Sequence, residues 1–297
     1  MKAMVVTNGA ITIVNAISIS KGSAMAIDLR TVAEVEVVEG GDVEIASARD
    51  RYGELEVSRE GGLIREVVTE VRRRKGIDDL GFRVMVQSEI PSARGLKSSS
   101  SVGTAVAVAA LKASGCEVRS DEVLEMVVSA SIRSGTSITG ALDDAAACLL
   151  GGVVVTDNLN RRLLMRSEAP SWVNVVLLIP PVKRYTGTFD RESLRPIKKL
   201  IEAAHDMATR GDFWTAATLN GVMHAVITDV PLDPIIGAMR LGAMASGMSG
   251  KGPTIFAVCE KEVTGDVRSH FSNYEGEVVV CSPTNHSALD ELCSSRS

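Results

Sequence analysis

The chain has 297 residues, of which 45% are hydrophobic and only 3% are aromatic, and its formal net charge is −5. This length suits one large domain or two ordinary ones with a sizeable core, and the bias toward small aliphatic residues favours mixed helix and strand packing, so we expect the α+β class. The acidic balance and the shortage of aromatic residues argue against a nucleic-acid partner, and no apolar run is long enough to cross a bilayer, which predicts a cytoplasmic protein without membrane contacts.

The first half of the sequence alternates between strand and helix patterns. Residues 10–38 have the period of a β-hairpin or meander that turns at Lys21 and Gly22. The basic run from Arg72 to Lys75 closes a helical pattern, and we interpret it as a solvated helix end because cations suit the C-terminal end of the helix dipole. The patterns predict strands within 10–38 and at 81–88 and 153–157, and helices at 62–75, 101–115, 120–134 and 139–152.

The second half begins where polar residues and Pro170 interrupt the pattern, near residues 158–172. We therefore expect one domain at 1–160 and a second at 161–297. Five cysteines are scattered without C-x-x-C spacing, which predicts reduced thiols. In this half the patterns predict a strand at 174–179, helices at 192–210, 212–227 and 233–245, a strand–helix–strand unit at 254–282, and a frayed tail at 293–297.

A serine-rich loop, PSARGLKSSSSVG at residues 91–103, connects a predicted strand directly to an apolar helix. A flexible Ser/Gly linker would instead join two independent units. The N-terminus of a helix offers free backbone N–H groups and a positive dipole end, and serine hydroxyls bond phosphate oxygens or Mg²⁺. The loop therefore predicts a phosphate site, although it is not a Walker loop, because the G-x-x-x-x-G-K-[ST] pattern occurs nowhere in the chain.

A second glycine-rich segment, SGMSGKGPT at 246–254, would alone indicate no more than a tight turn. Together, P-x-x-x-G-L-x-S-S at 91–99 and S-G-x-G-P-T at 249–254 resemble the superfamily of galactokinase, homoserine kinase, mevalonate kinase and phosphomevalonate kinase (GHMP kinases). The resemblance implies an N-terminal α+β domain whose serine loop wraps the ATP phosphates, a C-terminal ferredoxin-like α+β domain with the second turn, and a substrate cleft between them.

The same resemblance assigns ATP binding to both loops. The residues that it implies are Pro91, Ser92, Ala93, Arg94, Gly95, Leu96, Lys97, Ser98, Ser99, Ser100 and Ser101 in the first loop and Gly250, Lys251 and Gly252 in the second. Lys97 and Lys251 stand where relatives usually carry small residues. We hypothesise that at least one of these two ammonium groups reaches the ATP phosphates.

Two adjacent carboxylates, Asp143 and Asp144, interrupt the apolar segment 139–152. Such pairs are usually solvated surface charges, but in a buried segment they need partners such as Mg²⁺ or a substrate hydroxyl. The run from Gly140 to Asp144 also resembles the catalytic aspartate motif of GHMP kinases. This likeness makes Asp143 the favoured acceptor of the alcohol proton and Asp144 a second carboxylate of the catalytic site.

Many GHMP kinases hold Mg²⁺ with a glutamate about a dozen residues before the catalytic aspartate. The corresponding stretch here, SASIRSG at 129–135, contains no carboxylate, so the metal must be coordinated differently. Ser99 matches the metal-binding serine of the family. Asp144 is the candidate replacement for the missing glutamate.

Within the superfamily, the segments 12–29, 139–146 and 180–187 resemble archaeal shikimate kinases. This likeness implies transfer of the γ-phosphate of ATP to the 3-hydroxyl of shikimate, a small acceptor whose carboxylate needs a cation and several hydrogen-bonding groups. The candidates for this pocket are Asn15, Lys21, Arg133, Arg240, and Arg184 within the loop 183–186. The alternatives are homoserine kinase or another small-alcohol kinase of this superfamily, and a kinase-like sensor that binds its ligands without turnover.

Overall fold

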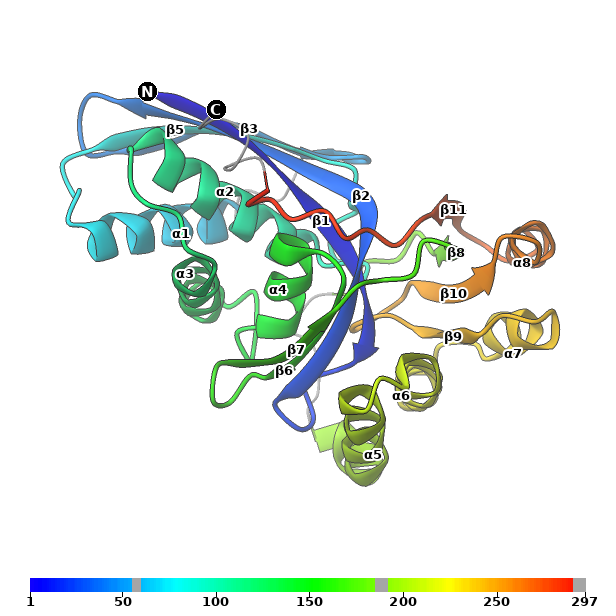
Figure 1. The fold of residues 1–297 in the computed structure, drawn as a ribbon. Helices are drawn as coiled ribbons and strands as arrows, with labels where there is room; N and C mark the ends of the chain where they lie inside the picture. Colours follow the sequence, from blue (N-terminus) through cyan, green and yellow to red (C-terminus); the bar gives the residue numbers. More distant parts are fainter. Residues whose placement is uncertain (55–59, 185–191, 291–297) are drawn as a thin grey trace.

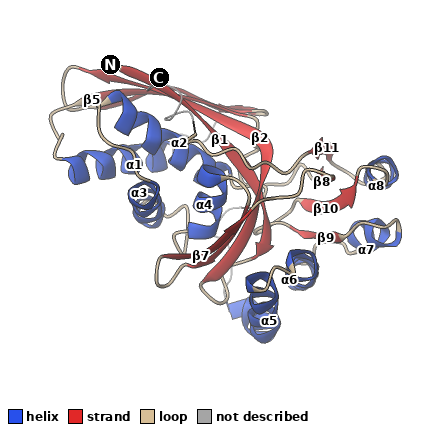
Figure 2. Cartoon of the chain, in the orientation of Figure 1, coloured by secondary structure: helices blue, strands red, loops and turns tan. Residues whose placement is uncertain are grey.

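The computed structural model describes residues 1–54, 60–184 and 192–290 of the chain. Within these residues no helix is both long and apolar enough to cross a membrane. The described chain forms two β-sheets with helices packed against them (Figures 1 and 2). The predicted α+β class is confirmed.

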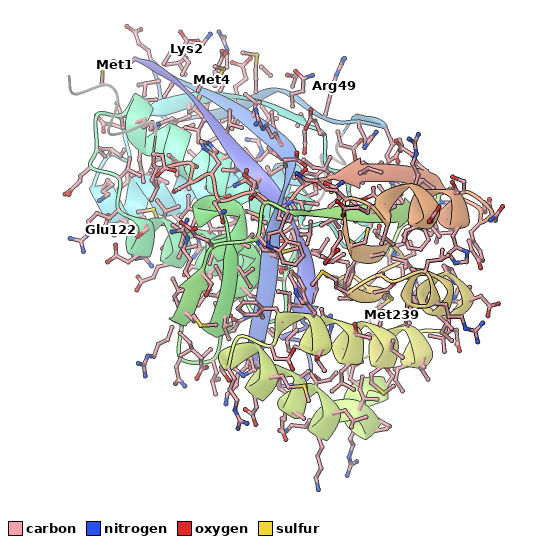
Figure 3. The ribbon with its side chains drawn as sticks, turned by 45° about the vertical axis from the view of Figure 1, so that its right-hand side comes forward. Met1, Lys2, Met4, Arg49, Glu122 and Met239 are labelled. Atoms are coloured by element: carbon pink, nitrogen blue, oxygen red, sulfur yellow. The ribbon has the colours of Figure 1, made fainter. Side chains whose placement is uncertain are left out.

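The larger sheet is built around one long central strand, β2. Strand β1 lies antiparallel along β2, whose other edge pairs first with β6 and then with β5. The strands of this sheet are β1 (Lys2–Val14), β2 (Lys21–Val38), β3 (Val43–Asp50), β4 (Gly53–Glu54), β5 (Gly81–Ser88), β6 (Val153–Asp157) and β7 (Arg162–Ser167). Met4 at the start of β1 and Arg49 of β3 project outward from this sheet (Figure 3).

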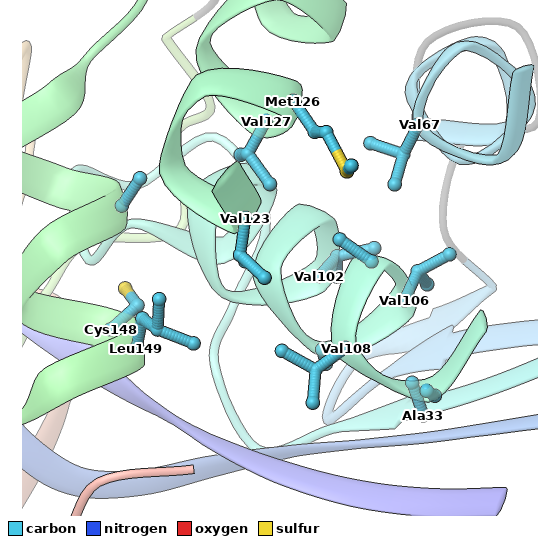
Figure 4. Packing of buried hydrophobic residues seen from close by; sticks show 14 of the residues in the cluster. Ala33, Val67, Val102, Val106, Val108, Val123, Met126, Val127, Cys148 and Leu149 are labelled. Atoms are coloured by element: carbon cyan, nitrogen blue, oxygen red, sulfur yellow. The ribbon is translucent and has the colours of Figure 1, made fainter. Parts of the chain in front are cut away.

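Four helices cover one face of the larger sheet and bury an aliphatic core (Figure 1). They are α1 (Glu60–Lys75), α2 (Ser98–Ala113), α3 (Ser120–Arg133) and α4 (Leu142–Leu150). Helices α2 and α4 both pack on the central strands β1 and β2, α2 also contacts α1, α3 and α4, and small residues such as Gly103 and Ala107 allow its close packing. Figure 4 shows Val102 and Val106 of α2 close to Val67 of α1 and Met126 of α3.

The smaller sheet has the antiparallel strand order β11-β8-β10-β9. With helices between β8 and β9 and between β10 and β11, this is the β-α-β-β-α-β arrangement of a ferredoxin-like unit. Its elements are β8 (Val173–Ile179), the 3₁₀ helix η2 (Glu192–Ile197), α5 (Lys198–Thr209), α6 (Phe213–Ile227), α7 (Asp233–Arg240), β9 (Ala245–Met248), β10 (Ile255–Glu260), α8 (Thr264–Phe271) and β11 (Glu277–Cys281).

The two sheets share a second core, in which Ile11 and Ile13 of β1 pack with Val175 and Leu177 of β8 and Ala217 of α6. The chain passes from the larger sheet to the smaller between Ser167 and Val173. The division at residue 160 stays a prediction, and it falls just before β7, which belongs to the larger sheet.

Several predicted elements differ from the structure. The turn of the opening hairpin lies at 15–20 and not at Lys21 and Gly22, which are already paired in β2. The serines at 98–100 belong to the first turn of α2, and the helix predicted at 233–245 ends at Arg240, so that β9 begins at Ala245. The frayed tail lies outside the described residues.

The basic run at the end of α1 has a buried carboxylate as its partner. Glu70 is 1% exposed and accepts bonds from Arg73 and Arg74, while Arg133 of α3 lies 3.0 Å away. Burial raises the pKa of Glu70, but the three arginines outweigh burial and hold that pKa at about 2. Arg74 and Lys75 also pair with Glu125 and Glu122 of α3, so the run is more than a solvated helix end because it anchors α1 to α3.

We expect Glu70→Gln to lower the free energy of unfolding at pH 7 by about 2 kcal/mol, after allowance for the solvent around the arginines. The folded-state pKa lies below the ordinary value, so this stabilisation is present above pH 4.5 and is lost as the pH falls toward about 2. Urea titrations at pH 7 and pH 3 measure it, with Glu66→Gln, an exposed partner of Arg133, as the control. Superimposable curves for Glu70→Gln and the unsubstituted protein at pH 7 would contradict the assignment.

Candidate functional site

The serine loop runs from the end of β5 to the first turn of α2. Lys97 stands just before the helix in the left-handed region (φ 71°), and this turn directs the N–H groups of the following serines toward a cavity. Ser98, Ser99 and Ser100 line that cavity, whereas the Ser101 hydroxyl bonds Thr7 of β1 at 2.9 Å. The loop therefore presents the N-terminus of a 16-residue helix to a hollow, as the phosphate-site prediction requires.

The two glycine-containing loops contact each other through their backbones. Gly95 has φ +84°, and a Cβ atom there would lie 2.2 Å from the carbonyl oxygen of Ser249. The Ser249 hydroxyl donates to Gly95 O at 2.8 Å and accepts from the Thr12 N–H at 3.1 Å, while Gly250 N donates to Thr12 Oγ1 at 2.8 Å. Thr12 of β1 thus joins the loops, and only glycine at position 95 permits this approach.

A cavity of about 290 Å³ lies between the two loops, the start of α4 and the loop 134–139. Its wall is rich in hydroxyl and backbone groups and contains cations and carboxylates. The residues on its wall are Asn15, Ala16, Ile17, Pro91, Ala93, Arg94, Gly95, Leu96, Lys97, Ser98, Ser99, Ser100, Ser131, Ser134, Gly135, Thr136, Ser137, Ile138, Thr139, Ala141, Asp143, Asp144, Arg184, Gly250 and Lys251. Of the predicted ATP-binding residues, Ser92, Ser101 and Gly252 do not line it.

Asp143 and Asp144 enter the cavity from the first turn of α4. Asp143 is 3% exposed, and its Oδ1 accepts a 2.8 Å bond from Asn158 Nδ2. Asp144 Oδ1 lies 2.9 Å from the ammonium of Lys97, whose side chain is 8% exposed. Burial raises the pKa of Asp143, Asp144 adds to the rise, and Lys97 and Asn158 oppose it, which places that pKa at about 7. The two neighbouring carboxylates are therefore in unlike environments.

Gly22 of β2 makes room for the Asp143 carboxyl. A Cβ atom at position 22 would lie 2.4 Å from Asp143 Cγ and Oδ2. Asn158, just after β6, closes the other side and is itself held by Thr156 Oγ1 at 2.6 Å. The central strand and its neighbour β6 therefore fix the carboxyl in one position, which suits a proton acceptor.

The two unusual lysines both reach the cavity wall. Lys97 Nζ donates to Thr12 Oγ1 at 2.5 Å in addition to its ion pair with Asp144. Burial and the nearby Lys97 both lower the pKa of Lys251 and Asp144 opposes them, with the net result that this pKa is about 8. Two ammonium groups and two carboxylates thus share this wall, and the hypothesis that an ammonium contacts phosphate stays a prediction.

The predicted acceptor-binding residues separate into two groups. Arg184 and Asn15 line the cavity, with Arg184 Nη2 bonded to Thr228 O at 3.0 Å and Asn15 Nδ2 to Gly250 O at 2.8 Å. Arg133 lies away from it, paired with Glu66 and Glu70 on α1. Lys21 and Arg240 are exposed and do not line it, while Tyr185 and Thr186 lie outside the described residues.

The oxygen atoms on the wall suit Mg²⁺ as ligands, because this ion prefers hard oxygen ligands and is usually held by one or two carboxylates together with substrate phosphates. Ser99 offers a hydroxyl and Asp144 a carboxylate on the same wall. The described residues hold no cluster of three or more His, Cys, Asp and Glu side chains that would form a complete metal cage. Ser99 and Asp144 are thus the residues that would hold the ion beside bound phosphates.

Sequence patterns left out three residues that build this site, namely Thr12, Gly22 and Asn158. Each acts through a contact more than ten positions away along the chain. Thr12 and Gly22 lie inside the segment 12–29 that carries the resemblance, which was the available signal. Residues 136–138 of the cavity wall carry no prediction from the sequence, because they lie between the stretch 129–135 and the helical segment 139–152.

Comparison with known proteins decides the family. The family model for the N-terminal domain of GHMP kinases matches residues 62–152, and that for the C-terminal domain matches residues 191–273. The chain belongs to the GHMP kinases. This GHMP kinase is 37% identical to the shikimate kinase of Methanocella arvoryzae over 97% of this chain and 96% of that one, with the same figures for the shikimate kinase of Methanothrix thermoacetophila.

Solved structures agree on the fold of this GHMP kinase. Homoserine kinase from Cytophaga hutchinsonii superimposes with a TM-score of 0.74 over 97% of both chains at 19% identity. The mevalonate kinase of Methanococcus jannaschii gives 0.70 over 96% of this chain and 99% of that one at 14% identity. At such identities the likeness concerns the fold alone, which confirms the predicted two-domain GHMP kinase architecture.

Proposed function

We propose that this protein is a cytoplasmic, ATP- and Mg²⁺-dependent shikimate kinase that transfers the γ-phosphate of ATP to the 3-hydroxyl of shikimate. The reaction type is supported by the cavity, in which a helix N-terminus, a second glycine turn and a buried carboxylate meet. The choice of acceptor is supported by the relatives named shikimate kinase, which align over nearly the whole chain.

The two loops provide the phosphate site. Backbone N–H groups at the start of α2 and the positive end of its dipole favour the polyphosphate, and Lys97 and Lys251 add positive charge on the wall. Bound Mg²⁺ would supply charge neutralisation on the phosphates, with Ser99 and Asp144 as its protein ligands. Asp143 and Lys97 are almost wholly buried, which limits the contact of these two groups with water.

Asp143 receives the proton of the acceptor hydroxyl. Its carboxylate lies on the cavity wall, is held by Asn158, and has a pKa raised toward neutrality, so it accepts a proton more readily than an ordinary aspartate does. The proton moves from the hydroxyl to Asp143 as the hydroxyl oxygen attacks the γ-phosphorus and ADP leaves.

The decisive experiment measures ADP release with shikimate, homoserine, mevalonate and galactose at matched concentrations, with Mg²⁺ and ATP present. We expect turnover with shikimate, and phosphorus NMR should place the new ester on the 3-oxygen. Turnover with homoserine instead would replace the proposed acceptor and retain the reaction. A chain that binds ATP and an acceptor but releases no ADP would be a sensor and not a kinase.

Arg184 is the cation we expect to bind the acceptor carboxylate. It is the arginine that lines the cavity from the smaller domain, and a guanidinium forms paired, charge-assisted bonds with a carboxylate. Arg184→Ala should raise the KM for shikimate about tenfold or more and change the KM for ATP by less than about twofold. Arg240→Ala, on an exposed part of α7, is the control, and equal effects on both KM values would remove Arg184 from this role.

A further inference from the structure

Arg94 lies in the nucleotide loop, yet its hydrogen bonds lead to the other side of the cavity. The side chain is 7% exposed, and its Nε and Nη2 donate to the carbonyl oxygens of Pro180 and Pro181 at 3.1 and 2.9 Å. Among the described residues it forms no ion pair with a carboxylate, and its Nη1 is buried without a hydrogen-bond partner. Its guanidinium also lies 4.5 Å from the centre of the Tyr52 ring.

The segment that receives these bonds carries Arg184. Pro180 follows β8 directly, and Arg184 N donates to the carbonyl of Ala93 at 2.8 Å. Residues 180–184 are therefore attached to Ala93 and Arg94 by three hydrogen bonds. Both prolines lack an N–H group and cannot donate to the loop themselves, so the two bonds from the guanidinium hold this part of the segment.

A lysine could not reproduce this attachment. The guanidinium is planar and offers donors in a fixed fork, which suits two successive carbonyl oxygens, whereas an ammonium is a single rotatable point of charge. The ring of Tyr52 fixes the plane of the fork from one side, and the Tyr52 hydroxyl bonds Glu277 of β11. Arg94 thus sits between the larger domain and the smaller one in an orientation set by its neighbours.

We propose that Arg94 is a positioning residue for the phosphate acceptor, although its place in the sequence belongs to the ATP loop. It fastens residues 180–184 to the loop, and Arg184 consequently lines the cavity, where we expect its guanidinium to bind the acceptor carboxylate. The inference rests on the proposed function, since it concerns the acceptor side of that site.

The test compares Arg94→Met and Arg94→Lys with the unsubstituted enzyme, using whichever acceptor of the four-compound panel it phosphorylates. We expect both variants to raise the KM and the Kd of that acceptor about tenfold and to leave the Kd of ATP within about twofold. In Arg94→Met combined with Arg184→Ala, the acceptor Kd should match that of Arg184→Ala alone, because both changes act through one side chain.

Arg166→Met is the matched control, since Arg166 also bonds main-chain carbonyls, at Gly151 and Leu150, but does not line the cavity. Two results would overturn the proposal. One is a rise in the Kd of ATP in Arg94→Met together with a normal Kd of ATP in Arg94→Lys, which would make Arg94 a phosphate ligand. The other is full additivity with Arg184→Ala.

A second measurement needs no turnover and separates this proposal from the proposed function. Amide hydrogen exchange at Arg184, whose N–H bonds Ala93, should become faster in Arg94→Met and stay unchanged in Arg166→Met. Unchanged exchange in Arg94→Met, with a normal unfolding transition, would contradict the attachment. If no acceptor is phosphorylated but exchange accelerates as expected, the proposed function fails and the attachment stands.

Discussion

Asp143→Asn should lower the turnover of shikimate by about 10²- to 10⁴-fold while changing the Kd of ATP by less than about twofold. The amide keeps the size of the side chain but cannot accept the hydroxyl proton at neutral pH. The carboxylate lines the cavity from the first turn of α4, and we assign the ATP phosphates to the serines and lysines of the two loops and not to Asp143. Steady-state kinetics and equilibrium binding of ATP measure the two effects separately.

Asp157→Asn is the matched control for this change. Asp157 lies at the end of β6 with its carboxylate bonded by Asn160, and it does not line the cavity. Near-normal turnover in Asp143→Asn would exclude Asp143 as the base. If Asp144→Asn alone lost turnover, the role of proton acceptor would then pass to Asp144, which lies beside Lys97.

Local patterns predicted the elements whose burial follows a simple period. The strand at 81–88 has the predicted bounds, and the helices at 120–133 and 213–227 lie within about two residues of theirs. Helix α2 began earlier than expected because Ser98, Ser99 and Ser100 read as a loop by composition. The phosphate hypothesis requires N–H groups at the start of a helix, and these three serines supply them. The difference therefore supports the proposed phosphate site.

Elements that depend on partners far along the chain were missed. Strand β7 (Arg162–Ser167) lies at an edge of the larger sheet with Leu163 and Leu164 exposed, so it carries no alternation of buried and exposed residues. Strand β9 has only four residues, all buried, and follows a helix closely. Such segments become strands because a neighbouring strand offers hydrogen bonds, which single-sequence periodicity does not record.

The candidate site was also predicted only in part, because the sequence indicated which loops meet but not which partner each side chain takes. The loop motifs predicted which backbone segments would meet, and Gly95 and Ser249 do meet. The choice among the arginines was open because Arg133, Arg184 and Arg240 all lie near a motif in the sequence. Only the fold shows that Arg133 forms ion pairs with Glu66 and Glu70. It also shows that Arg184 is held at the cavity by the hydrogen bond from its N–H to Ala93 O.

Gly22→Ala is the second change for which we expect a large effect, and it tests how Asp143 is held. The added Cβ would lie 2.4 Å from Asp143 Cγ and Oδ2 and 2.9 Å from its Cβ, so a simple rotation of the carboxyl does not relieve the contact. Either the Asn158 bond breaks or the start of α4 moves. We expect turnover to fall about 10²-fold or more, with a loss of about 1–3 kcal/mol in the free energy of unfolding from overpacking.

Gly62→Ala provides the control, because a Cβ atom at position 62 of α1 would have no atom within 4 Å. That variant should keep full activity, and its unfolding temperature should equal or slightly exceed that of the unsubstituted protein. In Gly22→Ala the Kd of ATP should stay within about twofold, since Gly22 does not line the cavity. A folded Gly22→Ala protein with unchanged turnover would mean that the Asp143 carboxyl does not need the space that Gly22 leaves, and the role given to Gly22 would fail.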